Sequence, residues 1–140
     1  MKRIAYLTGI SLFLGILIAL FVFIKLYNKP HIDVGDSKAD YVMSIEAIAG
    51  DFEENEAVAN EKYLDKIIQV EGVINDIALS DGNSILTLKA RQSDQSVVCT
   101  MAASENIKIV GLQKGNTVTV RGICTGYLMD VILVRAIIVN

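Results

Sequence analysis

Residues 4–24 contain no charged side chain. At about 1.5 Å per residue, a helix over this stretch would measure about 30 Å, the thickness of a bilayer's hydrocarbon core. Lipid offers no hydrogen bonds to a backbone, so a spanning segment of this kind must be helical. The sequence therefore predicts a transmembrane anchor over residues 1–25, followed by a linker over residues 26–38.

A cleaved signal peptide is the competing interpretation of this stretch. Such peptides have a shorter apolar core of about 7–15 residues and small residues at the cleavage site. Here residues 20–25 read Leu-Phe-Val-Phe-Ile-Lys, which is bulky throughout and favours a retained anchor.

The charges that flank the stretch are nearly balanced, with two basic residues on each side (Lys2, Arg3, Lys25 and Lys29). A short basic tail before an apolar span usually stays in the cytoplasm. We therefore expect a single-pass protein of the bacterial inner membrane, with a cytoplasmic N-terminus and residues 25–140 in the periplasm.

An amphipathic helix is predicted over residues 39–64. Its apolar residues recur at spacings of three and four, and acidic residues occupy the other face. We expect Asp36 or Ser37 to cap it and Gly50 to weaken or divide it. The apolar face is expected to pack on the following domain through Val42, Ile45, Ile48 and Phe52.

Apolar residues alternate with polar ones from residue 66 onward, the pattern of half-buried strands. Gly72 should allow the first strand to bend, Asp81-Gly82 should turn the chain, and Ser104 should cap a short helix over residues 102–111. A turn is also expected at residues 125–127. Five strands are predicted, at residues 67–79, 84–90, 96–101, 117–124 and 129–139.

The predicted order of three strands, a short helix and two strands is that of an OB-fold. We therefore expect a mainly β protein in which residues 65–140 form a five-stranded Greek-key barrel, with the helix between the third and fourth strands. A plain SH3-like barrel is the alternative, and the helix-compatible stretch favours the OB-fold.

A family resemblance rests on five segments that together extend over residues 38–139. The chain resembles the tRNA_anti-like family of small bacterial OB-fold proteins, a family common in Bacteroidetes. The resemblance implies an OB-fold held at a membrane by an anchor or a lipid, with no assigned activity. Lipidated members carry an N-terminal Cys that this chain lacks, so its helix would hold it. The segments are 38–41, 60–64, 70–73, 118–126 and 130–133.

Residue types that carry enzyme chemistry are scarce. The single His31 lies in the predicted linker, far from a plausible Ser or Cys nucleophile. Cys99 and Cys124 lie in predicted strands, where they can be buried thiols or one disulfide. No closed zinc set, phosphate loop or dinucleotide motif occurs. We expect no enzyme activity, no cofactor and no metal.

Features of nucleic-acid binders are also missing from the predicted barrel. Residues 66–140 hold seven Lys or Arg against six Asp or Glu. Tyr127 is the only aromatic residue of that segment, whereas single-strand binders need stacking aromatics beside a positive groove. The sequence argues against nucleic acid as a partner.

The function predicted is that of a non-enzymatic, membrane-anchored binding module for a protein partner or a small envelope ligand. OB-folds bind ligands on their second and third strands and adjoining loops. A structural subunit of a membrane complex is the alternative. The candidate binding residues are Asp81, Asn83, Lys89, Arg91 and Tyr127.

Overall fold

The computed structural model describes residues 14–24 and 34–139, which belong to two compact units, Met1–Ile32 and Asp33–Asn140. Residues 14–24 are helical and exposed. None of the described helices combines the length and the apolar character that a membrane crossing requires. Residues 1–13 and 25–33 lie outside the described residues, so the anchor over residues 4–24 stays a prediction.

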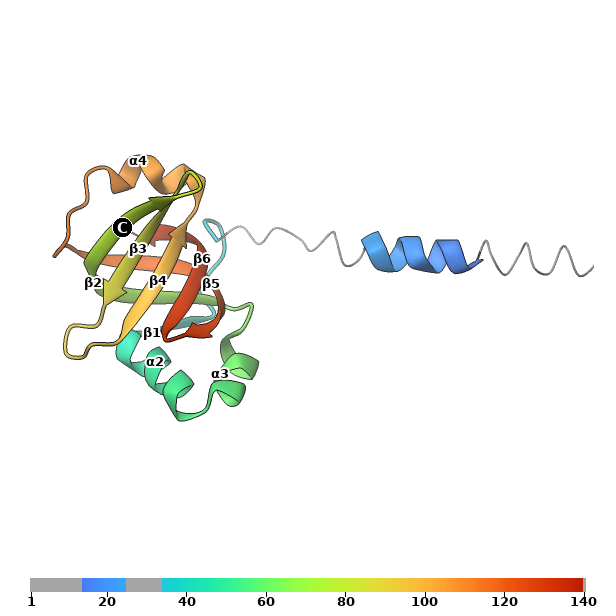
Figure 1. The fold of residues 1–140 in the computed structure, drawn as a ribbon, viewed down its shortest axis with the longest axis horizontal. Coiled ribbons are helices and arrows are strands. Elements are labelled where there is room, and N and C mark those ends of the chain that lie inside the picture. The colour runs from blue at the N-terminus through green and yellow to red at the C-terminus, as the bar shows by residue number, and fades with distance from the viewer. Residues whose placement is uncertain (1–13, 25–33, 140) are drawn as a thin grey trace, which may run out of the picture. The chain divides into compact units, whose positions relative to one another are not determined.

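Five strands close into a barrel in the order β2-β3-β4-β6-β5, and β5 pairs back onto β2 (Figure 1). Neighbouring strands are antiparallel except β4 and β6, which are parallel. This is the Greek-key order of an OB-fold, so the predicted barrel is confirmed. The strands are β2 (Ile67–Ser80), β3 (Asn83–Lys89), β4 (Ser96–Met101), β5 (Thr117–Leu128) and β6 (Asp130–Val139).

The long strand β2 serves both halves of the barrel. Residues 67–73 pair with β5, and residues 73–80 pair with β3. The change of partner occurs beside Gly72, where the sequence predicted a bend. Alternation places Ile68, Val70 and Ile74 in the core, each at most 1% exposed.

The hairpin between β5 and β6 departs from the prediction. The turn expected at residues 125–127 is wrong, because β5 continues to Leu128 and the chain turns at Met129, whose φ is 69°. Strand β6 is apolar on both faces, which the sequence explained by burial on both sides or by a bulge. The structure has a bulge at Arg135, where φ is 51° and the register with β5 shifts.

The short helix predicted between the third and fourth barrel strands is confirmed as a 3-10 turn, η1 (Ala103–Glu105), followed by α4 (Asn106–Ile109). Ser104 is not its N-cap, because Ala102 occupies that position without a side-chain hydrogen bond. Asn106 instead fixes the helix to the hairpin between β2 and β3. Its Oδ1 accepts from the backbone N–H of Ser84 at 3.2 Å, and its Nδ2 donates to the carbonyl of Gly82 at 3.0 Å.

The predicted helix over residues 39–64 is wrong at its start and in the position of its break. Its first residues form a strand, β1 (Tyr41–Ser44), that pairs in parallel with β2. The β-branched and aromatic residues there favour a strand, and Val42 is 72% exposed instead of packed on the barrel. Ser44, rather than Asp36 or Ser37, caps α2 (Ile45–Glu54) by accepting from the N–H of Ala47 at 3.2 Å.

The break after α2 comes at Asn55 rather than at Gly50. Asn55 ends α2 and caps α3 (Glu56–Tyr63), because its side chain accepts from the backbone N–H of Val58 at 3.2 Å. Asn is a strong N-cap residue, whereas a glycine inside a helix weakens the helix without necessarily ending it.

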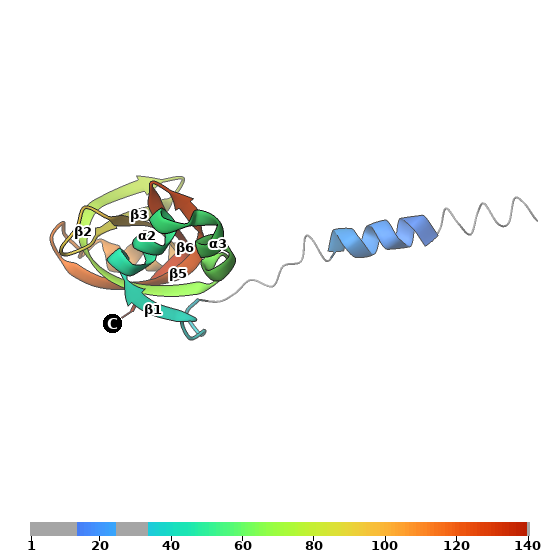
Figure 2. The same cartoon turned by 90° about the horizontal axis from the view of Figure 1, so that it is seen from below.

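Helix α2 lies across one opening of the barrel, and α4 lies at the other end (Figures 1 and 2). Ile45, Ile48 and Phe52 are at most 2% exposed and join the core, as the predicted apolar face required. Tyr63 of α3 is fully buried, and its ring lies 6.0 Å from that of Phe52. Helices α2 and α3 therefore complete the hydrophobic core at this opening of the barrel.

Residues 34–40, here called the strap, pack on the outside of the barrel. Val34 is 3% exposed and contacts Ile67 and Ile123, which are also buried. The last residues of the predicted linker are therefore part of the folded domain.

Both cysteines are free thiols, and both are fully buried among the strands. Burial raises the pKa of Cys99 to about 12 and raises that of Cys124. Of the two readings of the sequence, the buried-thiol reading is confirmed, and the thiols are expected to be unreactive at neutral pH.

Candidate functional site

The five candidate residues occupy three separate places on the barrel. Asp81 and Asn83 lie in the hairpin between β2 and β3, and Asp81 adopts a φ of 51°. Lys89 and Arg91 lie at the other end of β3, about 20 Å away at roughly 3.3 Å per residue. Tyr127 lies near the end of β5. The structure therefore brings together only Lys89 and Arg91.

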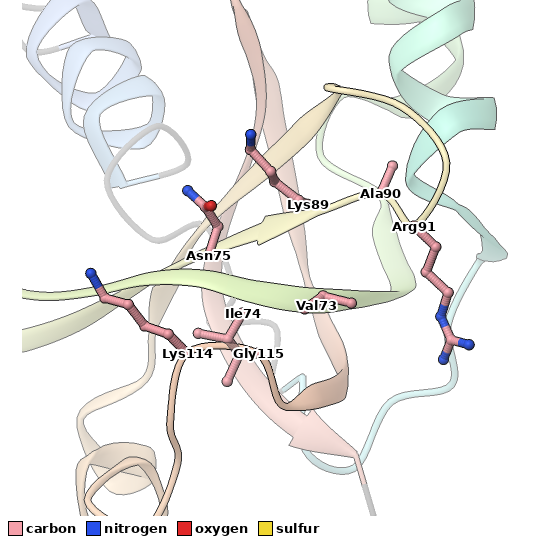
Figure 3. Close-up of a pocket in the computed structure, with 8 residues that line it drawn as sticks. All are labelled: Val73, Ile74, Asn75, Lys89, Ala90, Arg91, Lys114 and Gly115. Carbon is pink, nitrogen blue, oxygen red and sulfur yellow. The ribbon is translucent and has the colours of Figure 1, made fainter.

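Lys89 and Arg91 line an open groove of about 620 Å³ between β2, the end of β3 and the loop before β5. Asn75 and Lys114, which the sequence analysis did not select, also line it. The side chains of Lys89, Asn75 and Lys114 extend to one side, whereas Arg91 extends away from them (Figure 3).

Each cation of the groove has a carboxylate partner on the surface. Lys89 Nζ lies 3.8 Å from Asp94 Oδ1, and Arg91 Nη2 lies 2.6 Å from Glu71 Oε1. Lys114 Nζ lies 2.6 Å from Asp76 Oδ1, and this hydrogen bond lowers the pKa of Asp76. Three cations and three carboxylates leave the groove without the excess positive charge that phosphate binding requires.

Lys114 joins the groove through a tertiary contact that no local pattern reveals. The turn that carries it is fixed to β2 by two backbone hydrogen bonds. The N–H of Gly115 donates to the carbonyl of Ile74 at 2.8 Å, and the N–H of Ile74 donates to the carbonyl of Asn116 at 2.9 Å. The residue types Lys114-Gly115-Asn116 are typical of a turn, but its position beside β2 depends on the tertiary fold.

The Tyr127 ring packs against α2, the helix at the barrel opening. Its ring stacks on that of Phe52 with centroids 5.4 Å apart and planes 11° apart. Desolvation, and then the nearby carboxylates of Glu53 and Asp130, raises the pKa of Tyr127. The ring face toward Phe52 is occupied, so Tyr127 is poorly placed to stack on a nucleic-acid base.

A second surface, here called the outer face, is formed by the outward side chains of β3 and β4 and the tip of the hairpin between β5 and β6. Leu128 and Met129 at this tip are 77% and 88% exposed. Ser96 Oγ donates to Asp130, which places the tip beside the start of β4. Beyond the tip, β3 and β4 present half-buried Ile85, Thr87, Val98 and Thr100. Leu79 is 74% exposed but pairs with buried Ser84, so its side chain lies on the opposite side of the sheet from Ile85 and Thr87.

The two apolar residues at this tip, Leu128 and Met129, were missed because the sequence predicted a turn at residues 125–127. They could not be identified until the true end of β5 was known.

One polar cluster joins α2 and α3 and has a structural role. Asp51 Oδ2 accepts from Tyr63 Oη at 2.5 Å and from Lys62 Nζ at 3.1 Å. These bonds, Tyr63 first, lower the pKa of Asp51, whereas burial raises the pKa of Tyr63. Within residues 14–24 and 34–139, no group of three or more His, Cys, Asp or Glu is arranged to hold a metal ion. His31 lies outside the described residues.

Similarity to one solved structure supports the fold, and the fold alone. A lipoprotein from Klebsiella pneumoniae, described as a proposed nucleic acid-binding protein, aligns with a TM-score of 0.64 and 22% identity over 71% of this chain and 91% of that chain. A chain of the Schizosaccharomyces pombe Stn1–Ten1 complex aligns with a TM-score of 0.38 and 21% identity over 53% of this chain and 58% of that chain. No curated protein matches the sequence.

A family model covers nearly the whole chain. The tRNA_anti-like model matches residues 1–138, which include all of the barrel strands except the last residue of β6, and both α2 and α3. The sequence segments that carried the resemblance lie in the strap and the start of β1, in α3, and in β2, β5 and β6. The chain belongs to the tRNA_anti-like family.

Proposed function

We propose that this chain is a non-enzymatic binding module of the bacterial envelope, held at the inner membrane by residues 4–24. Its barrel would lie on the periplasmic side and bind a protein partner through the outer face. A small envelope ligand at the same face is the other form of this proposal.

The observation that carries the proposal is the exposure of Leu128 and Met129 at one end of the outer face. Exposed aliphatic side chains that continue a sheet face are typical of protein contact surfaces. The half-buried Thr and aliphatic residues of β3 and β4 add area without charge. A protein surface of matching apolar character would fit this face better than a charged ligand.

The outer face can be tested by photo-crosslinking in intact cells. A photoreactive residue at position 129 should give a discrete adduct, and the same residue at exposed Glu61 of α3 should not. Leu128→Ser should reduce the adduct several-fold because it removes apolar area from the tip of the outer face. Val58→Ser, at an exposed aliphatic of α3, should leave it unchanged. Equal adducts at positions 129 and 61 would contradict the proposal.

Nucleic acid is the second candidate partner, favoured by the three cations around the groove and by the use of OB-folds for this purpose. Their pairing with carboxylates predicts no binding of a labelled single-stranded oligonucleotide at physiological salt. The measurement is fluorescence anisotropy at several salt concentrations. A tight complex whose affinity falls steeply with salt would overturn this expectation.

Placement in the periplasm can be tested by labelling one engineered thiol. Asp94→Cys lies in the exposed loop after β3, whereas both native cysteines are fully buried. A membrane-impermeant maleimide should label intact cells that carry Asp94→Cys and should leave the unsubstituted chain unlabelled until it is denatured. Labelling that requires lysis would place the barrel in the cytoplasm.

A further inference from the structure

The strap is fixed to the barrel by polar bonds as well as by Val34. Arg121 Nη1 donates to the carbonyl of Ser37 at 2.8 Å. Asp40 pairs twice with Ile67, because its N–H donates to the Ile67 carbonyl and its carboxylate accepts from the Ile67 N–H, both at 2.8 Å. The strap therefore sets the point at which the chain leaves the domain.

The chain between the strap and the apolar stretch is short. Residues 25–33 can extend at most about 32 Å at roughly 3.5 Å per residue. If residues 4–24 lie in the bilayer, a contact between the strap side of the domain and the lipid surface is therefore within reach.

The cations that have no carboxylate partner lie in the strap or next to residues that it contacts. Residues 34–139 contain nine Lys or Arg, and five of them form ion pairs. Among these described residues the four others make no ion pair. Lys38 is in the strap, and Lys66 directly precedes Ile67. Arg121 donates to the carbonyl of Ser37, and Arg135 lies at the β6 bulge beside Val134, which packs on the Val34 cluster.

These four cations and the strap define the strap face. Asp36, Asp40 and Asp65 share it, and the carboxylate of Asp40 is engaged by Ile67. Arg121 is occupied by Gln69 and Ser37. Three exposed cations, Lys38, Lys66 and Arg135, remain available to an external anion, against the two exposed carboxylates of Asp36 and Asp65. With Arg121 and Asp40 included, four cations face three carboxylates, so the strap face keeps an excess of one positive charge.

We propose that the strap face docks on the anionic phospholipid surface, with Lys38, Lys66 and Arg135 contacting headgroup phosphates. This inference rests on the proposed function, since it requires the anchor to lie in a bilayer. The strand order places β3 and β4 on the other side of the barrel from the pairing of β2 with β5 (Figure 1). Docking would therefore turn the outer face away from the lipid and toward soluble partners.

The test uses the full chain in vesicles of equal parts phosphatidylglycerol and phosphatidylcholine that contain a lipid-attached quencher. A fluorophore on Asp36→Cys, in the strap, should be quenched strongly, and one on Asp94→Cys, in the loop after β3, should be quenched weakly. Pure phosphatidylcholine vesicles or high salt should reduce the quenching at position 36.

The matched variants remove equal charge from two parts of the surface. Lys38→Gln/Lys66→Gln/Arg135→Gln should lower the docked-to-undocked ratio by about a hundredfold, at about fivefold for each cation near an anionic surface. Lys89→Gln/Arg91→Gln/Lys114→Gln, at the groove, should leave it unchanged. Circular dichroism checks that both variants remain folded.

Vesicle flotation with alkaline extraction distinguishes the absence of a membrane anchor from the absence of docking by the strap face. A chain that does not float, or that alkali removes, has no anchor in the bilayer, and the proposed function and this inference both fall. A chain that floats but gives equal quenching at positions 36 and 94, or quenching that ignores the anionic lipid, overturns only the docking of the strap face.

Discussion

Phe52→Ala is expected to lower the free energy of unfolding by about 3–5 kcal/mol, the usual cost of truncating a buried aromatic residue. Phe52 is 2% exposed and fills the barrel opening against two rings, Tyr63 at 6.0 Å and Tyr127 at 5.4 Å. The small side chain would leave a cavity under α2 and free the Tyr127 ring. Urea unfolding followed by circular dichroism measures the change. The slope of the unfolding free energy with urea concentration (the m-value) should stay the same.

The control for Phe52→Ala is Val58→Ala on α3. Val58 is 58% exposed, so the change should stay within about 0.5 kcal/mol. If Phe52→Ala cost less than about 1 kcal/mol, α2 would not be part of the barrel core, and these helices would be a separable appendage rather than a cover of the opening.

Gly72→Ala is expected to destabilise the domain by about 1–3 kcal/mol, the range for overpacking a filled core. A Cβ at this position would lie 2.6 Å from Ile45 Cδ1, 3.0 Å from the Lys89 carbonyl oxygen and 3.1 Å from Leu88 Cβ. The Ile45 methyl group can rotate, but the carbonyl oxygen and the Cβ belong to β3 and cannot move without disturbing its pairing with β2.

Gly50→Ala is the matched control, because the same methyl group enters open space. No atom lies within 4 Å of a Cβ at Gly50, which is inside α2. The change should stabilise the domain by about 0.5–1 kcal/mol through helix propensity. Thermal unfolding of both variants should therefore shift in opposite directions. A neutral Gly72→Ala would show that β2 and β3 separate more easily than this packing implies.

The barrel could be predicted from the sequence because its strands alternate cleanly and its turns contain Asp-Gly or other turn residues. The bend of β2 was expected at Gly72, and the structure changes strand partner there. The third strand has the predicted bounds, Ser96–Met101. Periodicity of this kind is a local property, so it survives in one sequence without an alignment.

The N-terminal segment was harder to predict because its strand is only four residues long and helical periodicity runs through it. Tyr41 and Met43 pack against the core while Val42 is exposed. Spacings of three and four also fit Val42 with Ile45, so a helix was predicted. Pairing of β1 with β2 is a tertiary effect that overrides local propensity.

The candidate site could be predicted only in part, for a physical reason. Lys89 and Arg91 are near in sequence and stay near in the groove, whereas Tyr127 and Asp81 depend on where distant strands meet. The stacking of Tyr127 on Phe52 could not be predicted from residue spacing in the sequence, because it joins β5 to a helix far away in the chain.

The most direct test of the account exchanges the anchor while the barrel is left intact. Residues 4–24 are replaced by an unrelated apolar span, and the photo-adduct at position 129 is measured in intact cells. The account predicts that the same adduct persists and that Leu128→Ser still reduces it. An adduct that disappears with the anchor, and that is unaffected by Leu128→Ser, would show that recognition resides in the membrane segment and would contradict the assignment of the outer face.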